Sequence, residues 1–121
     1  MSIEYSTENK DKYLLIKSRG ESADLDVVSN YSREITEHCR EQGYSNMLVD
    51  ERDREYLLAE VLDLYKIANF FRSLDISDLR IAIICQEKYL EQVHFLEITA
   101  QNRGMNIKFF LDTDSAERWL L

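Results

Sequence analysis

The sequence predicts an α/β fold in which helices cover a mostly parallel five-stranded sheet. Short β-branched runs alternate with longer segments whose apolar residues recur every three or four positions, the pattern of strands alternating with amphipathic helices. The chain has 121 residues, of which 45% are hydrophobic, so it can bury the core of one domain. It has no proline and three glycines, so nothing in it has the composition of a linker, and we expect a single domain over residues 1–121.

The chain begins with a predicted hairpin. Residues 2–7 and 12–18 have the composition of strands, and the polar segment 8–11 between them predicts an antiparallel connection. The second run is apolar at nearly every position, which is typical of a strand covered on both faces. We expect residues 19–22 to end it.

The middle of the chain reads as helix, strand, loop, helix and strand. Residues 24–42 carry one apolar stripe and predict the first helix, and residues 46–50 predict a short strand. The charged residues 51–55 predict a loop. Residues 57–74 predict a second helix that is apolar around much of its circumference, and residues 79–85 predict the clearest strand because they are β-branched.

The last part of the chain predicts a helix over 89–103, a strand over 106–110 and a short final helix over 112–121. The candidates for capping the final helix are Asp112, Thr113 and Asp114. The complete order is then β-β-α-β-α-β-α-β-α. Alternating strands and helices predict parallel strands joined by right-handed crossovers, and the opening hairpin adds an antiparallel strand at one edge.

The C-terminal segment resembles a known family in detail. It combines a turn, a strand and a closing helix with an acid, an alanine and a Trp-Leu pair: Asn102-Arg103-Gly104, residues 107–110, Asp112, Ala116 and Trp119-Leu120. With its element order, the chain resembles the STAS fold of anti-sigma-factor antagonists, especially small stand-alone bacterial STAS-like proteins. It is more distantly similar to the C-terminal lobe of CRAL-TRIO lipid-transfer proteins. The resemblance implies a regulatory module that binds other proteins, or alternatively a small carrier of apolar, lipid-like ligands.

One departure from that family is visible in the sequence. Classical anti-sigma-factor antagonists carry a phosphorylatable serine just after the third strand, at the start of the second helix. The corresponding residues 50–57 read DERDREYL, that is, acids and arginines followed by Tyr56 and Leu57, without serine or threonine. We therefore expect no phosphorylation switch of the classical type.

Composition and motifs disfavour several classes of function. The chain has 23 acidic and 15 basic residues, a net charge of −8, which opposes binding to nucleic acid or to an anionic membrane. No stretch approaches the roughly 20 apolar residues of a membrane span. Cys39 and Cys85 form no Cys-x-x-Cys pair, so we expect a reduced, cytoplasmic protein. No metal-ligand spacing, glycine-rich phosphate loop or nucleophile–base pair is recognisable, and we expect a non-enzymatic protein without a cofactor.

The segment after the third strand is the main candidate for a binding site. Ligands of parallel sheets collect at the carboxyl ends of the strands, and two arginines beside three acids could clamp a carboxylate or phosphate. The alternative is a solvated loop whose charges pair with one another. The candidates for binding a partner or ligand are Asp50, Glu51, Arg52, Asp53, Arg54, Tyr56 and Gln86. We expect the two arginines to be exposed.

Two further hypotheses concern apolar surfaces. The second predicted helix could line a pocket for an apolar ligand, with Leu62, Tyr65, Phe70 and Phe71 as lining, although ordinary core packing is the alternative. Successive crossovers of one hand place several helices on the same face of the sheet. The second face is also apolar in the strand pattern, and we expect a homodimer to cover it.

Overall fold

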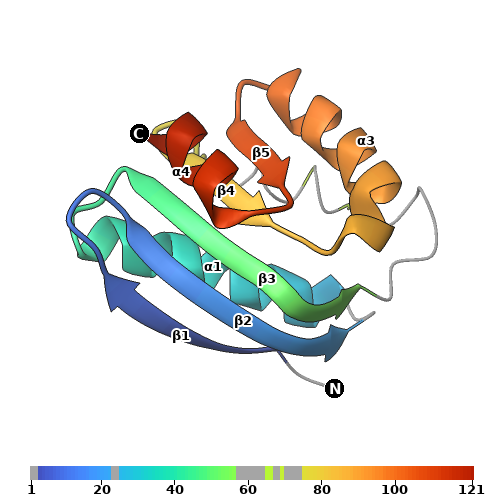
Figure 1. Ribbon diagram of the computed structural model, residues 1–121, viewed down its shortest axis with the longest axis horizontal. Helices are drawn as coiled ribbons and strands as arrows, with labels where there is room; N and C mark the ends of the chain where they lie inside the picture. The colour runs from blue at the N-terminus through green and yellow to red at the C-terminus, as the bar shows by residue number, and fades with distance from the viewer. Residues whose placement is uncertain (1–2, 23–24, 57–64, 67–68, 70–74) are drawn as a thin grey trace.

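The computed structural model describes residues 3–22, 25–56, 65–66, 69 and 75–121, and the strands in these ranges form a five-stranded sheet (Figure 1). The strands lie side by side in chain order: β1 (Ile3–Asn9), β2 (Leu14–Ser22), β3 (Asn46–Tyr56), β4 (Arg80–Ile84) and β5 (Asn106–Phe110). β1 is antiparallel to β2, and every other neighbouring pair is parallel. The predicted α/β fold, a mostly parallel sheet with an antiparallel N-terminal edge strand, is confirmed.

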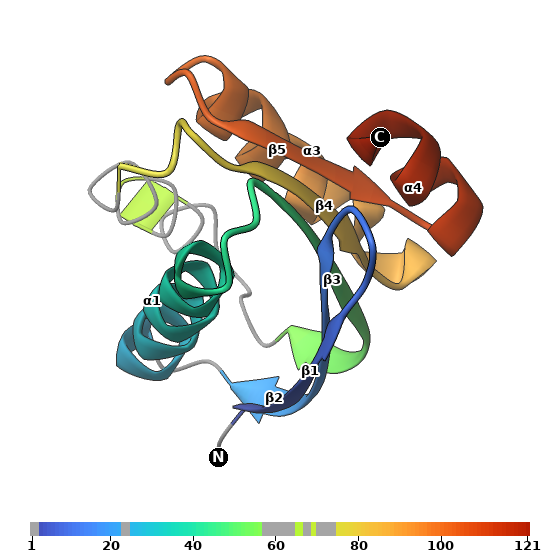
Figure 2. The same ribbon diagram turned by 90° about the vertical axis from the view of Figure 1, so that its left-hand side faces the viewer.

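Helices lie on both faces of the sheet. Their bounds are α1 (Leu25–Glu41), α3 (Leu90–Gln101), which follows the 3-10 turn η1 (Glu87–Tyr89), and α4 (Thr113–Leu120). Figure 2 shows α1 and α4 on opposite sides of the sheet. α3 shares its core with α1 and therefore covers the same face. Of the helix predicted over 57–74, only Tyr65, Lys66 and Asn69 are described, so that prediction lies outside the described residues.

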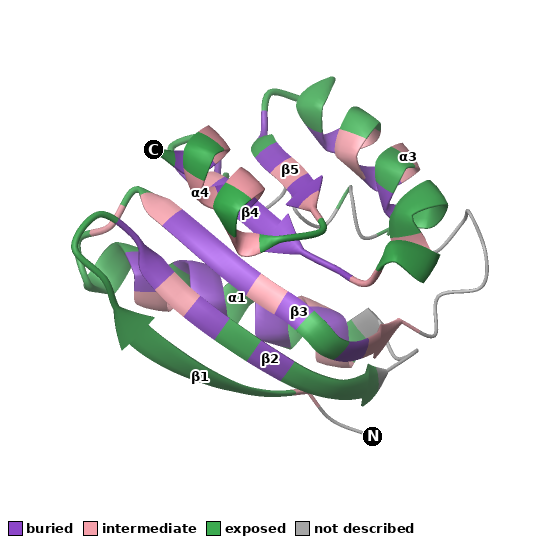
Figure 3. Cartoon of the chain, viewed as in Figure 1, coloured by how far each residue is buried: buried purple, intermediate pink, exposed green. Residues whose placement is uncertain are grey.

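The period of two in the strands divides the core into two layers. On the α1 face, Ile16, Val49 and Ile83 pack with side chains of α1 and α3. On the opposite face, Leu48 and Ala82 pack beneath α4. Figure 3 shows buried residues concentrated on the inner strands, whereas β1 is exposed along nearly its whole length.

α4 changes the expectation for the second face. It contacts β3, β4 and β5 and buries Ala116 and Leu120 against them, so this part of the face is covered by the chain itself. Over β1 and β2 the same face carries exposed charges, including the ion pair of Arg19 with Glu4 at 2.6 Å and the exposed Lys17. The uncovered apolar face that motivated a homodimer is therefore absent from the described residues, and the homodimer stays a prediction.

Two predicted boundaries are wrong. Residues 19–22 continue β2, and residues 51–55 form the second half of β3 and no loop. The two halves pair with each other, from Arg19 opposite Asp53 to Ser22 opposite Tyr56. Their charged side chains suit a strand here because β4 ends opposite Asp50, which leaves the far half of β3 at the margin of the sheet. Within the ranges described, no helix has the length and apolar character needed to cross a membrane.

Candidate functional site

A β-bulge positions the two charged residues at the centre of the candidate site. Lys17 pairs with Asp50, but Arg19 pairs with Asp53, so two steps along β2 correspond to three along β3. In a regular strand, residues three apart point to opposite faces. The extra residue restores them to one face. Glu51 and Arg54 consequently both point toward α1, and they are only 7% and 5% exposed.

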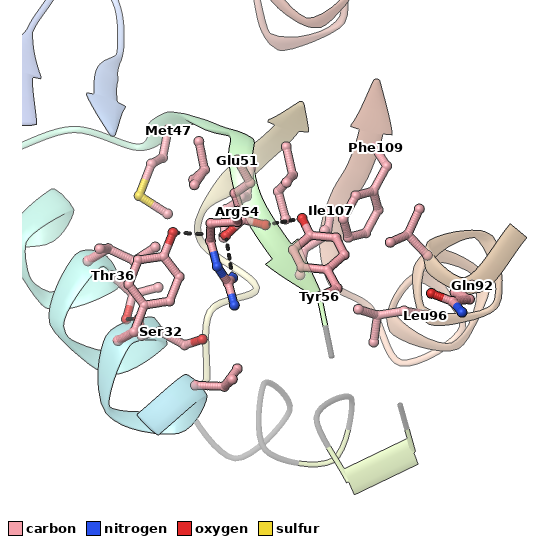
Figure 4. Close-up of a pocket in the computed structure, with 17 residues that line it drawn as sticks. Ser32, Thr36, Met47, Glu51, Arg54, Tyr56, Gln92, Leu96, Ile107 and Phe109 are labelled. Atoms are coloured by element: carbon pink, nitrogen blue, oxygen red, sulfur yellow. Dashed lines mark hydrogen bonds and ion pairs between the residues drawn. The ribbon is translucent and has the colours of Figure 1, made fainter. Parts of the chain in front are cut away.

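The carboxylate of Glu51 is held from several directions (Figure 4). Its Oε2 atom accepts hydrogen bonds from the Tyr31 hydroxyl of α1 at 2.9 Å and from the Arg54 guanidinium at 3.0 Å. Its Oε1 atom accepts from the Tyr56 hydroxyl. The Ser18 hydroxyl of β2 bonds in turn to the Tyr31 hydroxyl. A buried charge needs such partners, because burial without them is very costly.

Arg54 combines an ion pair with aromatic contacts. Its guanidinium carbon lies 5.3 Å from the centre of the Tyr31 ring and 5.1 Å from that of Tyr56. Burial lowers the pKa of Arg54, but the Glu51 charge and the two tyrosines outweigh burial, so the pKa is raised and the guanidinium stays charged. Its Nε atom is buried and has no hydrogen-bond partner among the residues that the structure describes. The site thus contains one unused, charge-assisted donor.

The two tyrosines act as neutral donors. Burial raises the pKa of Tyr31 well above its ordinary value, and the Glu51 charge raises it further. The same two causes raise the pKa of Tyr56. Both hydroxyls therefore stay protonated near neutral pH, and each donates a hydrogen bond to the Glu51 carboxylate.

A cavity opens beside this cluster, between α1, α3 and the sheet (Figure 4). The space open to the centre of a water-sized sphere is about 80 Å³. One water needs roughly 10–15 Å³ on the same measure. Among the described residues, the lining is mainly apolar and comes from α1, α3, β3, β4 and β5, including Val28, Ile35, Val49, Ile83, Leu96 and Phe109. Glu51, Arg54 and Tyr56 line its polar end.

The opposite face of the β3 end is polar and accessible. Arg52 is exposed, and its guanidinium is held in a fork by Asp50, with Nε–Oδ1 and Nη2–Oδ2 distances of 2.9 and 2.7 Å. It also reaches the Thr113 hydroxyl at the start of α4, at 3.5 Å. Asp53 beside it is exposed. We call Asp50, Arg52, Asp53 and Thr113 the outer patch.

Side chains after β4 replace the missing strand beside the end of β3. The Gln86 amide donates to the carbonyl oxygens of Arg52 and Arg54 at 2.9 and 3.0 Å. Glu55 accepts from the Tyr89 hydroxyl and pairs with Lys88 at 2.9 Å. These hydrogen bonds, Tyr89 first, lower the pKa of Glu55 to about 2. The Gln86 side chain therefore bonds to backbone carbonyl groups at the end of β3, which β4 does not reach.

The structure separates the predicted site residues into two groups. Asp50, Arg52 and Asp53 belong to the outer patch, whereas Glu51, Arg54 and Tyr56 belong to the cavity. The expectation that both arginines are exposed is wrong for Arg54, because the bulge turns it toward the core.

None of the four residues predicted to line a pocket is among the described residues that line the cavity. Leu62, Phe70 and Phe71 lie outside the described residues. Tyr65 is 44% exposed, makes an edge contact with Phe95 at 5.0 Å between ring centres, and does not line the cavity.

Sequence reasoning missed Tyr31, Ser18 and Tyr89. Tyr31 lies within the helix predicted over residues 24–42, and its position there carries no signal for a carboxylate partner. In the part of the chain that the structure describes, no three histidine, cysteine, aspartate or glutamate side chains form a group that could hold a metal ion. Burial raises the pKa of the Cys39 and Cys85 thiols to about 11.

Known proteins resemble the chain in structure. No protein-family model and no curated protein matches it. One similar structure is an uncharacterized DUF3478-family protein with a SpoIIAA-like fold from Shewanella loihica PV-4, with a TM-score of 0.57, 22% identity, and coverage of 99% of this chain and 94% of that one. Another is an anti-sigma factor antagonist from Mycobacterium paratuberculosis, with a TM-score of 0.65, 12% identity, and coverage of 98% and 94%. Identities this low establish the fold alone: the chain has the STAS-like fold that its sequence predicts.

Proposed function

We propose that this protein is a non-enzymatic regulatory module that acts by binding another protein, and that the outer patch is its contact surface. The fold is that of a known anti-sigma factor antagonist, which makes regulation through protein contacts the natural starting hypothesis. Residues 50–57 contain no serine or threonine, so the proposed module is not switched by serine or threonine phosphorylation of this segment.

The observation that carries the proposal is the forked pair of Arg52 and Asp50. An exposed ion pair contributes little to stability, about 0–1 kcal/mol. An arginine already held in one geometry, however, loses less conformational freedom on binding, and arginine is enriched among the residues that dominate protein interfaces. Asp50 holds Arg52 in this way on a strand of the central sheet, while the guanidinium stays accessible.

The test compares three versions of the full chain as bait in a lysate of the source organism. Arg52→Ala should reduce capture of specific partners, whereas Arg40→Ala should not. Arg40 is a matched control because it is also exposed and pairs with Asp78 at 3.0 Å, but from α1. Both variants should retain the parental melting temperature to within a degree or two, since exposed substitutions usually cost less than about 0.5 kcal/mol.

The outcomes distinguish a wrong contact surface from a wrong function. Equal capture by the parent and Arg52→Ala contradicts the assignment of the outer patch. Failure of the parent to retain any protein beyond bare resin contradicts the proposed function itself.

A second candidate function is favoured by the cavity. Its apolar walls and its volume suit a small apolar ligand better than solvent. Native mass spectrometry of freshly purified protein should then show a species heavier than the bare chain. A single peak at the mass of the chain, 14.4 kDa, counts against a retained ligand.

A further inference from the structure

We propose that the cavity selects a small, uncharged, mostly apolar molecule whose single hydrogen-bond acceptor meets the Arg54 guanidinium. The inference rests on the second candidate function, ligand binding in the cavity, and adds the chemistry of the ligand's polar group. Ketone, ester and amide carbonyls are acceptors of this kind.

The walls set the apolar part of the ligand. Among the described residues, they are formed mainly by aliphatic and aromatic side chains of α1, α3 and three strands. Two hydroxyl-bearing residues of α1, Ser32 and Thr36, also line the cavity, but Thr36 already donates to the carbonyl oxygen of Ser32 at 2.9 Å. The exposed Gln92 of α3 also lines the cavity, but most of the lining is apolar, and an apolar ligand gains by leaving water.

The polar end of the cavity offers donors and few acceptors. Glu51 already accepts from Tyr31, Arg54 and Tyr56, out of about four lone-pair positions on a carboxylate. Arg54 carries five N–H groups, and within the described ranges its buried Nε has no partner. The guanidinium lies over the rings of Tyr31 and Tyr56, and Figure 4 shows it beside Glu51 and Tyr56. A ligand that supplies an acceptor therefore completes an unfinished network.

Charge decides against an ionic ligand. Glu51 and Arg54 lie 3.0 Å apart and neutralise each other. A ligand carboxylate would place a second negative charge close to Glu51, where little water screens it, and a ligand ammonium would meet Arg54. A neutral acceptor avoids both penalties and still forms a hydrogen bond to a charged donor.

Three probes of nearly equal shape test this chemistry on the full chain. Acetophenone offers a neutral carbonyl, α-methylstyrene replaces that oxygen with a methylene group, and benzoate carries a negative charge. Dissociation constants are measured by titration calorimetry or ligand-observed NMR. Acetophenone should bind at least about tenfold more tightly than either of the others, the effect expected of one hydrogen bond to a charged group.

A direct readout needs no substitution. The Arg54 Nε–H resonance in a 1H–15N spectrum should shift on addition of acetophenone and stay in place with α-methylstyrene.

The double variant Glu51→Gln/Arg54→Met should bind both neutral probes about equally. Arg40→Met is its matched control, since Arg40 is exposed, pairs with Asp78 and does not line the cavity, and it should keep the parental preference for acetophenone.

Each alternative result has a definite meaning. Equal affinity for acetophenone and α-methylstyrene overturns the inference and leaves apolar-ligand binding intact. Tightest binding of benzoate also overturns it, because the charge argument is then wrong. If none of the three binds, the ligand-binding function of the cavity fails with it.

Discussion

Glu55 is a partly exposed carboxylate whose titration reports its hydrogen bond with the Tyr89 hydroxyl. The Tyr89 hydroxyl and Lys88 lower its pKa to about 2. Because the folded pKa lies below the unfolded value, near 4.3, the stabilisation is present above the unfolded value and disappears as the pH falls toward 2. The contact therefore links Glu55 on β3 to η1 at neutral pH.

Replacing Tyr89 with Phe should raise the pKa of Glu55 toward its ordinary value, because the leading hydrogen bond is lost while Lys88 remains. The measurement is an NMR titration of the side-chain carboxyl carbons. Tyr44→Phe is the control, since the Tyr44 hydroxyl bonds to the backbone carbonyl of Lys10 and no carboxylate. A Glu55 pKa near 4 in the parent protein would show that the contact does not persist in solution.

Single residues with a local mechanism could be predicted from the sequence. Asp112 was one of three candidates for the cap of the last helix, and its carboxylate accepts from the backbone N–H of Ser115 at 2.7 Å. Gly43 follows the first helix and has a φ of 80°, a conformation that glycine adopts easily. Tyr31 could not be predicted as a donor, because its partner lies 20 residues away on another element.

At the scale of elements, the two edges of the sheet are treated differently. β5 is capped from α3: Glu97 accepts from the Phe109 backbone N–H at 2.8 Å, and the Gln101 amide donates to the Ile107 carbonyl at 3.2 Å. Such contacts occupy groups that would otherwise pair with a foreign strand. β1, the opposite edge, carries mostly exposed polar side chains.

Glu97→Ala should lower the free energy of unfolding by about 1 kcal/mol, the typical net value of a hydrogen bond. It should also speed hydrogen exchange at the Phe109 amide specifically. Urea denaturation and amide exchange followed by NMR measure the two effects. Glu91→Ala, an exposed change on the same helix, should alter neither. Unchanged exchange at Phe109 would mean that Glu97 does not cap the edge.

The far half of β3 shows why one element escaped prediction. Residues 51–55 are all charged, which is typical of a loop, and the stretch of β2 that pairs with them, residues 19–22, also looked like a terminus. Each segment is a strand only because the other lies beside it. The bulge then reverses the alternation, so the period of two would have assigned Glu51 and Arg54 to opposite faces.

At the scale of the whole molecule, the alternation of strands and helices was enough to predict the topology. Right-handed crossovers explain why α1 and α3 share one face. The position of α4 was not predicted, because it follows the last strand and no crossover constrains it. Long-range contacts fix it instead: Arg80 lies 4.1 Å from the centre of the Trp119 ring, and Tyr13 donates to Glu117 at 2.9 Å.

The buried pair of Glu51 and Arg54 joins the fold to the candidate site, so its energetics involve the whole molecule. Breaking a buried ion pair by removing one partner leaves the other charge stranded and costs about 3–5 kcal/mol. Removing both partners together avoids that penalty. The intact pair is therefore more stable than variants that lack one partner, but it need not be more stable than a variant that lacks both. The proposed ligand contact of Arg54 gives the pair a second role.

A double-mutant cycle measures this coupling. Arg54→Met alone should lower the free energy of unfolding by about 3 kcal/mol or more, and Glu51→Gln/Arg54→Met should recover much of that loss. Urea denaturation of the two single variants and the double variant gives the coupling energy. The exposed pair of Glu4 and Arg19 is the control, where Arg19→Met should cost less than about 1 kcal/mol. If the changes in the free energy of unfolding at Glu51 and Arg54 were additive, water would reach the pair, and the polar end of the cavity would be hydrated.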